Sequence, residues 1–133
     1  MRKTLDYFKL LSDASRVRIL MLLDRKELCV CQIMGVLGMS QPLVSRNLTL
    51  LQKGGFLDDR REGKMIFYVL KRCLTEPQRT LMELLRRELA ENPQVDADLN
   101  SLMDCTEYQK KSGKCDMETF LAYMREKKEG RSR

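Results

Sequence analysis

A short apolar helix, a tight turn and a longer capped helix follow one another in this chain, and their order constrains the fold more than any other feature. Ile33, Met34 and Leu37 form the apolar stripe of the short helix. Gly38 suits the left-handed residue of a tight turn, and Ser40 predicts the N-cap of the longer helix. The longer helix has its own stripe at i, i+4 and i+7, formed by Val44, Leu48 and Leu51. This order is the outline of a helix-turn-helix.

The segment after this unit predicts a β-hairpin. Residues 56–61 and 64–70 surround a polar turn, and the second segment is rich in β-branched and aromatic side chains. Further helices are predicted at residues 4–11, at residues 12–24 with Ser12 as N-cap, and from Thr75, which forms a capping-box pattern with Gln78. A hairpin directly after a helix-turn-helix makes a winged helix. We therefore predict a mainly α protein with a small β-hairpin wing (α+β).

Three parts of the chain differ in pattern. Residues 1–92 are expected to form the winged-helix and dimerisation domain, with Pro93 ending its last helix. An apolar stripe in that helix has no obvious cover in the chain and predicts a second subunit; it consists of Leu81, Met82, Leu85 and Leu89. Residues 93–127 are expected to add a helical hairpin, and residues 128–133 a disordered tail.

The distribution of charge favours a polyanion partner. Residues 1–70 hold 12 Lys and Arg against 7 Asp and Glu, whereas residues 71–133 hold 13 against 12. Side chains on the polar face of the longer helix and at the hairpin tip can bind phosphates or read base edges. The candidate DNA-binding residues are Ser40, Gln41, Ser45, Arg46, Asn47, Thr49 and Lys53 in the helix region and Arg60, Arg61 and Lys64 in the hairpin. A solvated basic surface is the alternative, but no acidic residue occurs from Gly35 to Leu57.

Cys29 and Cys31 stand at the entry to the short helix. Thiolates are soft ligands for soft ions, and a helix N-terminus lowers the pKa of a thiol. Residues i and i+2 of a regular helix point about 200° apart. Two such sulfurs can therefore share an ion only at a helix start, or after binding has distorted the helix. Two buried, small apolar side chains are the alternative interpretation.

The residue content excludes several classes of protein. The chain has no His, which removes His-based zinc sites and the Ser–His and Cys–His catalytic pairs, so we do not expect an enzyme or an organic cofactor. No secretion signal is recognisable, and no apolar run approaches the ~20 residues of a membrane span. We therefore expect a cytoplasmic protein without a membrane partner, whose five cysteines stay reduced.

The stretch from Leu11 to Leu70 resembles the arsenic-responsive repressor (ArsR/SmtB) family of winged-helix metalloregulators. The resemblance rests on LSDASRVRIL at residues 11–20, ELCVC at 27–31, SQPLVSRNL at 40–48 and the strand pair around Gly63-Lys64. The ELCVC segment marks the arsenic- and antimony-sensing branch of the family. The resemblance implies a homodimer on a near-palindromic DNA operator, with As(III) or Sb(III) as the inducer bound by the thiolates of Cys29 and Cys31.

The chain departs from the family pattern at two positions. The family usually has a third cysteine where this chain has Met34, so we consider Cys115 or Cys105 as a third metal ligand. Packing at the helical hairpin is the alternative role for both cysteines. The family often has His in the reading helix where this chain has Asn47, which bears on operator preference.

The sequence thus predicts a DNA-binding transcriptional repressor that is released from its operator by trivalent arsenic or antimony. One alternative keeps the DNA module but replaces the signal with another soft metal, or with oxidation of Cys29 and Cys31. A thiol-redox enzyme is disfavoured because the chain has neither His nor Trp and no βαβ pattern. A winged helix that binds only protein would lack the steep salt dependence of DNA binding.

Overall fold

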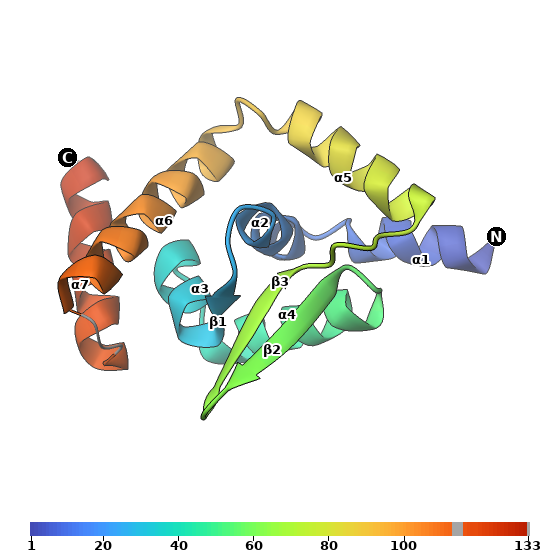
Figure 1. Ribbon diagram of the computed structural model, residues 1–133. Coiled ribbons are helices and arrows are strands. Elements are labelled where there is room, and N and C mark those ends of the chain that lie inside the picture. Colours follow the sequence, from blue (N-terminus) through green and yellow to red (C-terminus); the bar gives the residue numbers. More distant parts are fainter. Residues whose placement is uncertain (113–115, 133) are drawn as a thin grey trace.

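The computed structural model describes residues 1–112 and 116–132 and has the predicted winged-helix architecture (Figure 1). The elements are α1 (Arg2–Leu10), α2 (Ala14–Leu23), β1 (Leu28–Cys29), α3 (Val30–Leu37), α4 (Gln41–Lys53), β2 (Leu57–Glu62), β3 (Met65–Leu70), α5 (Glu76–Glu88), α6 (Pro93–Ser112) and α7 (Met117–Ser132). Helices α3 and α4 form the helix-turn-helix, and β2 and β3 form the wing. The predicted mainly α fold with a small β-hairpin is confirmed.

The sheet has three antiparallel strands in the order β1-β3-β2. Strand β1 is only two residues long, with Leu28 opposite Tyr68 and Cys29 opposite Phe67. A segment this short carries no alternating pattern, so the sequence did not predict it. Its pairing ties the backbone of Cys29 to the wing.

Local capping explains where the helices begin and end. Helix α3 ends at Gly38, whose φ of 68° is the left-handed conformation that glycine adopts readily, and Ser40 caps α4 by accepting the Leu43 N–H at 3.4 Å. Both predictions are confirmed. The N-cap of α2 is Asp13 rather than Ser12. The Ser12 hydroxyl instead donates to the Lys9 carbonyl at the end of α1.

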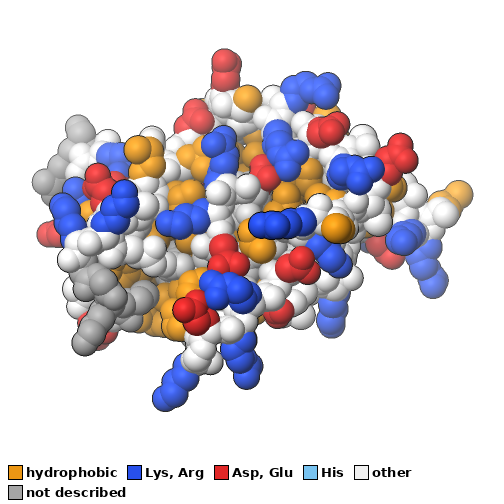
Figure 2. Space-filling view, in the orientation of Figure 1, with side chains coloured by type: hydrophobic (Ala, Val, Ile, Leu, Met, Phe, Trp, Pro, Cys, Tyr) orange, Lys and Arg blue, Asp and Glu red, His pale blue; other side chains and the backbone are white. Residues whose placement is uncertain are grey.

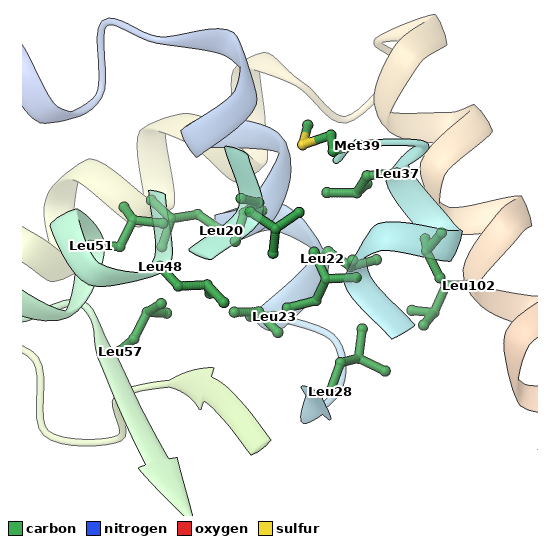
Figure 3. Close-up of a cluster of buried hydrophobic side chains, with 14 of the residues drawn as sticks. Leu20, Leu22, Leu23, Leu28, Leu37, Met39, Leu48, Leu51, Leu57 and Leu102 are labelled. Carbon is green, nitrogen blue, oxygen red and sulfur yellow. The ribbon is translucent and has the colours of Figure 1, made fainter. Parts of the chain in front are cut away.

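The core lies where α2, α3, α4 and the sheet meet, and α6 covers its far side (Figure 3). Leucines of α2 fill its centre, and Leu48 and Leu51 of α4 close it from one side. Leu102 approaches α3 from α6. The core also includes Cys105 of α6 and Phe120 of α7, so the C-terminal helices pack into the same core as the winged helix.

The C-terminal third differs from the sequence-based expectation. Helix α5 ends at Glu88, and Pro93 begins α6 rather than ending α5, since proline is well tolerated in a first helical turn. Helix α7 continues to Ser132, so the expected disordered tail is wrong for residues 128–132. Arg131 explains the difference, because it donates to Ser101 Oγ at 3.0 Å and pairs with Asp104 of α6.

The apolar stripe of α5 is only partly covered. Met82 is fully buried in the core, whereas the other three residues of the stripe, Leu81, Leu85 and Leu89, are half-buried; Leu84, beside the stripe, is 47% exposed. Among the described residues, no helix combines the length and apolar character needed to cross a membrane.

Candidate thiol site and nucleic-acid interface

The two thiols meet at the first turn of α3. Cys29 is the N-cap, with extended backbone at φ −88° and ψ 170°, and Cys31 is the second residue of the helix. Their sulfurs lie 3.2 Å apart, and both side chains are buried. The sequence left two arrangements open: sulfurs that meet at a helix start, or sulfurs that meet only after the helix is distorted. The structure has the first, with Cys29 at the N-cap of α3. The pair converges without any distortion of α3.

Residue Gln32 helps to hold this arrangement. The Cys29 N–H donates to Gln32 Oε1 at 3.0 Å, and the Gln32 N–H points back to the Cys29 sulfur. This is a capping box in which a cysteine takes the place of the usual Ser or Thr. Because the strand pairing to Phe67 fixes the backbone on the other side, Cys29 is held from two directions.

Hydrogen bonding favours the thiolate form of Cys29. The hydrogen bond with Cys31 is the main cause that lowers the pKa of Cys29 to about 6, burial opposes the shift, and the Gln32 N–H adds to it. A thiolate is the form that binds soft ions. The lowered pKa therefore favours the thiolate of Cys29, the candidate ligand, at neutral pH.

The third ligand stays a prediction. Within residues 1–112 and 116–132, no three Cys, Asp or Glu side chains gather in a group that could hold a metal ion. Cys105 is buried on α6, and Cys115 lies outside the described residues. Met34, in the position of the family's third cysteine, is half-buried and packs against the core.

Most candidate DNA-binding residues of the reading helix α4 are accessible. Ser45 is half-buried, and the exposed residues are Ser40, Gln41, Arg46, Thr49 and Lys53. The Thr49 hydroxyl donates to the Ser45 carbonyl at 3.0 Å. In the described part of the chain, neither Arg46 nor Lys53 takes part in an ion pair, so both charges are available to a polyanion.

The structure differs from the prediction at Asn47, which the sequence analysis placed among the candidate DNA-binding residues but which is buried. Its side chain is 1% exposed, and Oδ1 accepts a hydrogen bond from Arg16 Nη1 at 3.3 Å. Arg16 also donates to the Leu10 carbonyl at 2.6 Å, so Asn47 links α4 to the α1–α2 corner and is not exposed on the surface of α4. The sequence contained the signal, because position 47 lies three residues after Val44 and four before Leu51, on the buried face of α4.

The wing carries three candidate DNA-binding cations, of which two are exposed without an ion pair among the described residues and one is held in ion pairs within the wing region. Arg60 pairs with Glu27 at 2.5 Å and Glu62 at 2.7 Å and lies 4.9 Å above the Phe67 ring, so it braces the wing. Arg61 and Lys64 are exposed at the tip, and neither forms an ion pair with a described residue. Lys and Arg side chains project from the lower edge of the molecule, where the hairpin ends (Figure 2).

Comparison with known proteins identifies the family. Residues 13–59, which include the thiol pair and α4, match the family described as "Bacterial regulatory protein, arsR family". Over 94 residues the chain is 42% identical to the arsenic resistance transcriptional regulator ArsR2 of Pseudomonas putida, a match that covers 70% of this chain and 79% of that protein. The chain belongs to the arsR family.

Other similar proteins are regulators too. The cadmium resistance transcriptional regulatory protein CadC of Listeria innocua is 38% identical over 66 residues, which are 49% of this chain and 56% of CadC. The homodimeric winged helix-turn-helix DNA-binding domain of Mb0332 from Mycobacterium bovis superposes with a TM-score of 0.57 at 29% identity, covering 69% of this chain and 82% of that domain. This arsR-family chain is accordingly a DNA-binding transcriptional regulator, in agreement with the prediction that it is not an enzyme.

Proposed function

We propose that the protein is a repressor that leaves its operator when trivalent arsenic or antimony binds Cys29 and Cys31. The observation that carries this proposal is the pair of buried sulfurs, 3.2 Å apart, at the first turn of the helix that precedes the reading helix. Binding of a soft ion requires reduced thiols, so we place the protein in the reducing cytoplasm.

The spacing of the sulfurs favours a pyramidal ion. An ion bonded to both sulfurs at about 2.3 Å, as soft metal–thiolate bonds are, would subtend an angle of about 90° between them at their present distance. Three-coordinate As(III) and Sb(III) carry a lone pair and prefer angles near this value. A tetrahedral ion such as Zn²⁺ or Cd²⁺ would push the sulfurs further apart.

Ion binding can act on the reading helix without unwinding α3. The Cys29 sulfur that would bind the ion also receives the Gln32 N–H, so ligation draws electron density from this acceptor and weakens a cap worth about 1 kcal/mol. The chain passes from α3 through the turn at Gly38 directly into α4. A movement of the N-terminal end of α3 would therefore shift this turn and, with it, α4. Two reading helices in a dimer must stay about 34 Å apart to fit successive turns of DNA, so a small displacement weakens binding strongly.

A second copy of this chain fits the uncovered apolar surface. Leu5 and Phe8 of α1 are 49% and 59% exposed, and Leu84 of α5 is 47% exposed. Single exposed apolar residues are common on protein surfaces. Three of them on α1 and α5, however, are consistent with a homodimer interface, and the similar Mycobacterium bovis domain is a homodimer. A two-fold dimer in turn implies a near-palindromic operator.

A mobility-shift experiment tests the proposal on the DNA upstream of the protein's own gene. Wild-type protein is expected to bind this DNA and to leave it when arsenite is added. Cys29→Ser is expected to bind DNA and to stay bound in arsenite. The matched control is Cys73→Ser, which removes an exposed thiol and should respond as the wild type does. Release of Cys29→Ser by arsenite would contradict the proposal.

Oxidation of the same pair is the second candidate signal, because sulfurs at 3.2 Å are already in contact. An oxidant would then dissolve the complex and arsenite would leave it intact. A cadmium salt gives a third arm of the same experiment, which separates a metalloid response from a response to another soft metal.

A further inference from the structure

The two C-terminal helices, α6 and α7, pack closely on the second half of α3. Phe120 of α7 is 1% exposed, and its ring lies against Gly35 so closely that a Cβ at this glycine would sit 2.4 Å from Cε2. Glycine in a helix interior costs about 1 kcal/mol relative to alanine, so its presence in α3 has a packing reason. Glycine at this position lowers the intrinsic stability of α3 but allows α7 to pack closely against it.

The last carbonyl groups of α3 bind cations from outside the helix. Lys128 of α7 donates to the Gly35 carbonyl at 2.8 Å, and Arg18 of α2 donates to the Leu37 carbonyl at 3.1 Å. Arg18 is itself held by two hydrogen bonds of 2.9 Å to Asp98 of α6. The final carbonyls of a helix have no partner within it, and its C-terminal dipole favours positive charge. Helix α7 thus supplies one of these two cations, Lys128, and α6 holds the other, Arg18, in place through Asp98.

The environment of Lys128 shows that this contact is built into the fold. Burial lowers the pKa of Lys128, with Asp98 and Asp104 opposing that shift and Arg18 and Arg131 adding to it. The hydrogen bond of Arg131 to Ser101 fixes the same part of α7 to α6. The ammonium group therefore sits among charged neighbours at the α3 terminus, with its side chain half-buried.

We propose that Lys128 is a positioning residue for DNA reading, which holds the C-terminal end of α3 and so fixes the turn that presents α4. The proposal rests on the DNA-binding function given above. Gly38 and Met39 follow directly and donate to the Met34 carbonyl at 2.8 and 3.3 Å, and Ser40 then caps α4. A loosened α3 terminus leaves this turn without its fixed starting point.

The test compares Lys128→Met with Lys127→Met in the full-length protein. Methionine keeps most of the apolar stem, so both variants are expected to fold. Both lose one charge, but Lys127 is exposed and its ammonium lies 5.6 Å from the Tyr123 ring, with no role at the α3 terminus. Amide hydrogen exchange at Gly38 and Met39 is expected to accelerate about five- to tenfold in Lys128→Met only, while amides of β3 exchange as in the wild type.

DNA binding to the upstream fragment gives the second readout. Lys128→Met is expected to lose about five- to tenfold in affinity at every salt concentration, with an unchanged slope of log K against log salt. A slope reduced by about 0.9 would mean that Lys128 touches a phosphate, and the positioning role would be wrong. Equal exchange and equal affinity in the two variants would overturn the proposal as well. If the wild type fails to bind this DNA, the proposed function fails, and the exchange measurement alone decides the role of Lys128.

Discussion

Replacing Gly35 by alanine separates two opposing physical effects. Helix propensity alone predicts that alanine stabilises α3 by about 1 kcal/mol. Packing predicts the opposite, because the new Cβ would lie 2.4, 2.9 and 3.2 Å from three carbon atoms of the Phe120 ring. Ordinary contact begins near 3.4 Å, so the ring or the whole of α7 must retreat by about 1 Å.

The packing effect should be the larger of the two. Overpacking a well-filled core costs about 1–3 kcal/mol, and Phe120 is buried too deeply to turn aside without disturbing its neighbour Tyr108, whose ring centroid lies 5.3 Å away. Subtracting the gain in helix propensity of about 1 kcal/mol, we expect Gly35→Ala to lower the free energy of unfolding by up to about 2 kcal/mol.

Urea unfolding of four proteins measures this coupling: the wild type, Gly35→Ala, Phe120→Leu and the double variant. Leucine lacks the ring atoms that the Cβ would meet, so alanine should become stabilising by about 1 kcal/mol in that background. All four are compared at one protein concentration, because the proposed dimerisation would make apparent stability depend on concentration. An equal effect of alanine in both backgrounds, or stabilisation of the wild type by alanine, would contradict a steric clash between position 35 and the Phe120 ring.

Three further measurements address other parts of the site. Since the Cys31 hydrogen bond lowers the pKa of Cys29 to about 6, ultraviolet thiolate absorbance is expected to rise as pH increases through that value, and to lose this step in Cys29→Ser. A Cys31→Ala protein, which has no side-chain donor at position 31, would contradict the stated origin if it kept the step unshifted. Asn47→Ala is expected to lower the free energy of unfolding by about 1 kcal/mol, with no change in the salt slope of DNA binding; a reduced slope would restore Asn47 to the interface. Lys64→Ala at the wing tip should reduce that slope by about 1, and an unchanged slope would place the tip away from DNA.

The sequence predicts the winged helix well because its local signals agree with the tertiary fold. Ser40 and the Thr75–Gln78 pair cap their helices as their spacing indicates, and Gly38 ends α3 in the left-handed conformation. The β-branched and aromatic residues around a polar turn also give the wing to within a residue or so at each end. These features depend on neighbours close in the chain.

Features that depend on distant partners were not predictable in the same way. The short strand β1 exists because it pairs with β3, about forty residues later, and Arg131 orders the end of α7 by reaching back to α6. The convergence of the two sulfurs depends on β1 as well, since an extended Cys29 is what turns its side chain toward Cys31. The helical spacing of two residues alone left that geometry open.

Helix α3 connects the proposed thiol site with the proposed positioning contact of Lys128. Its eight residues span about 12 Å, with the thiol pair at the N-cap and the Lys128 contact near the other end. A short helix with one loose end would absorb a change at its N-cap by fraying, whereas a helix held at its C-terminal end must tilt as a unit. Lys128→Met should therefore blunt the release by arsenite as well as weaken DNA binding. A variant that binds DNA weakly but responds to arsenite in full would show that the thiol signal does not travel through α3.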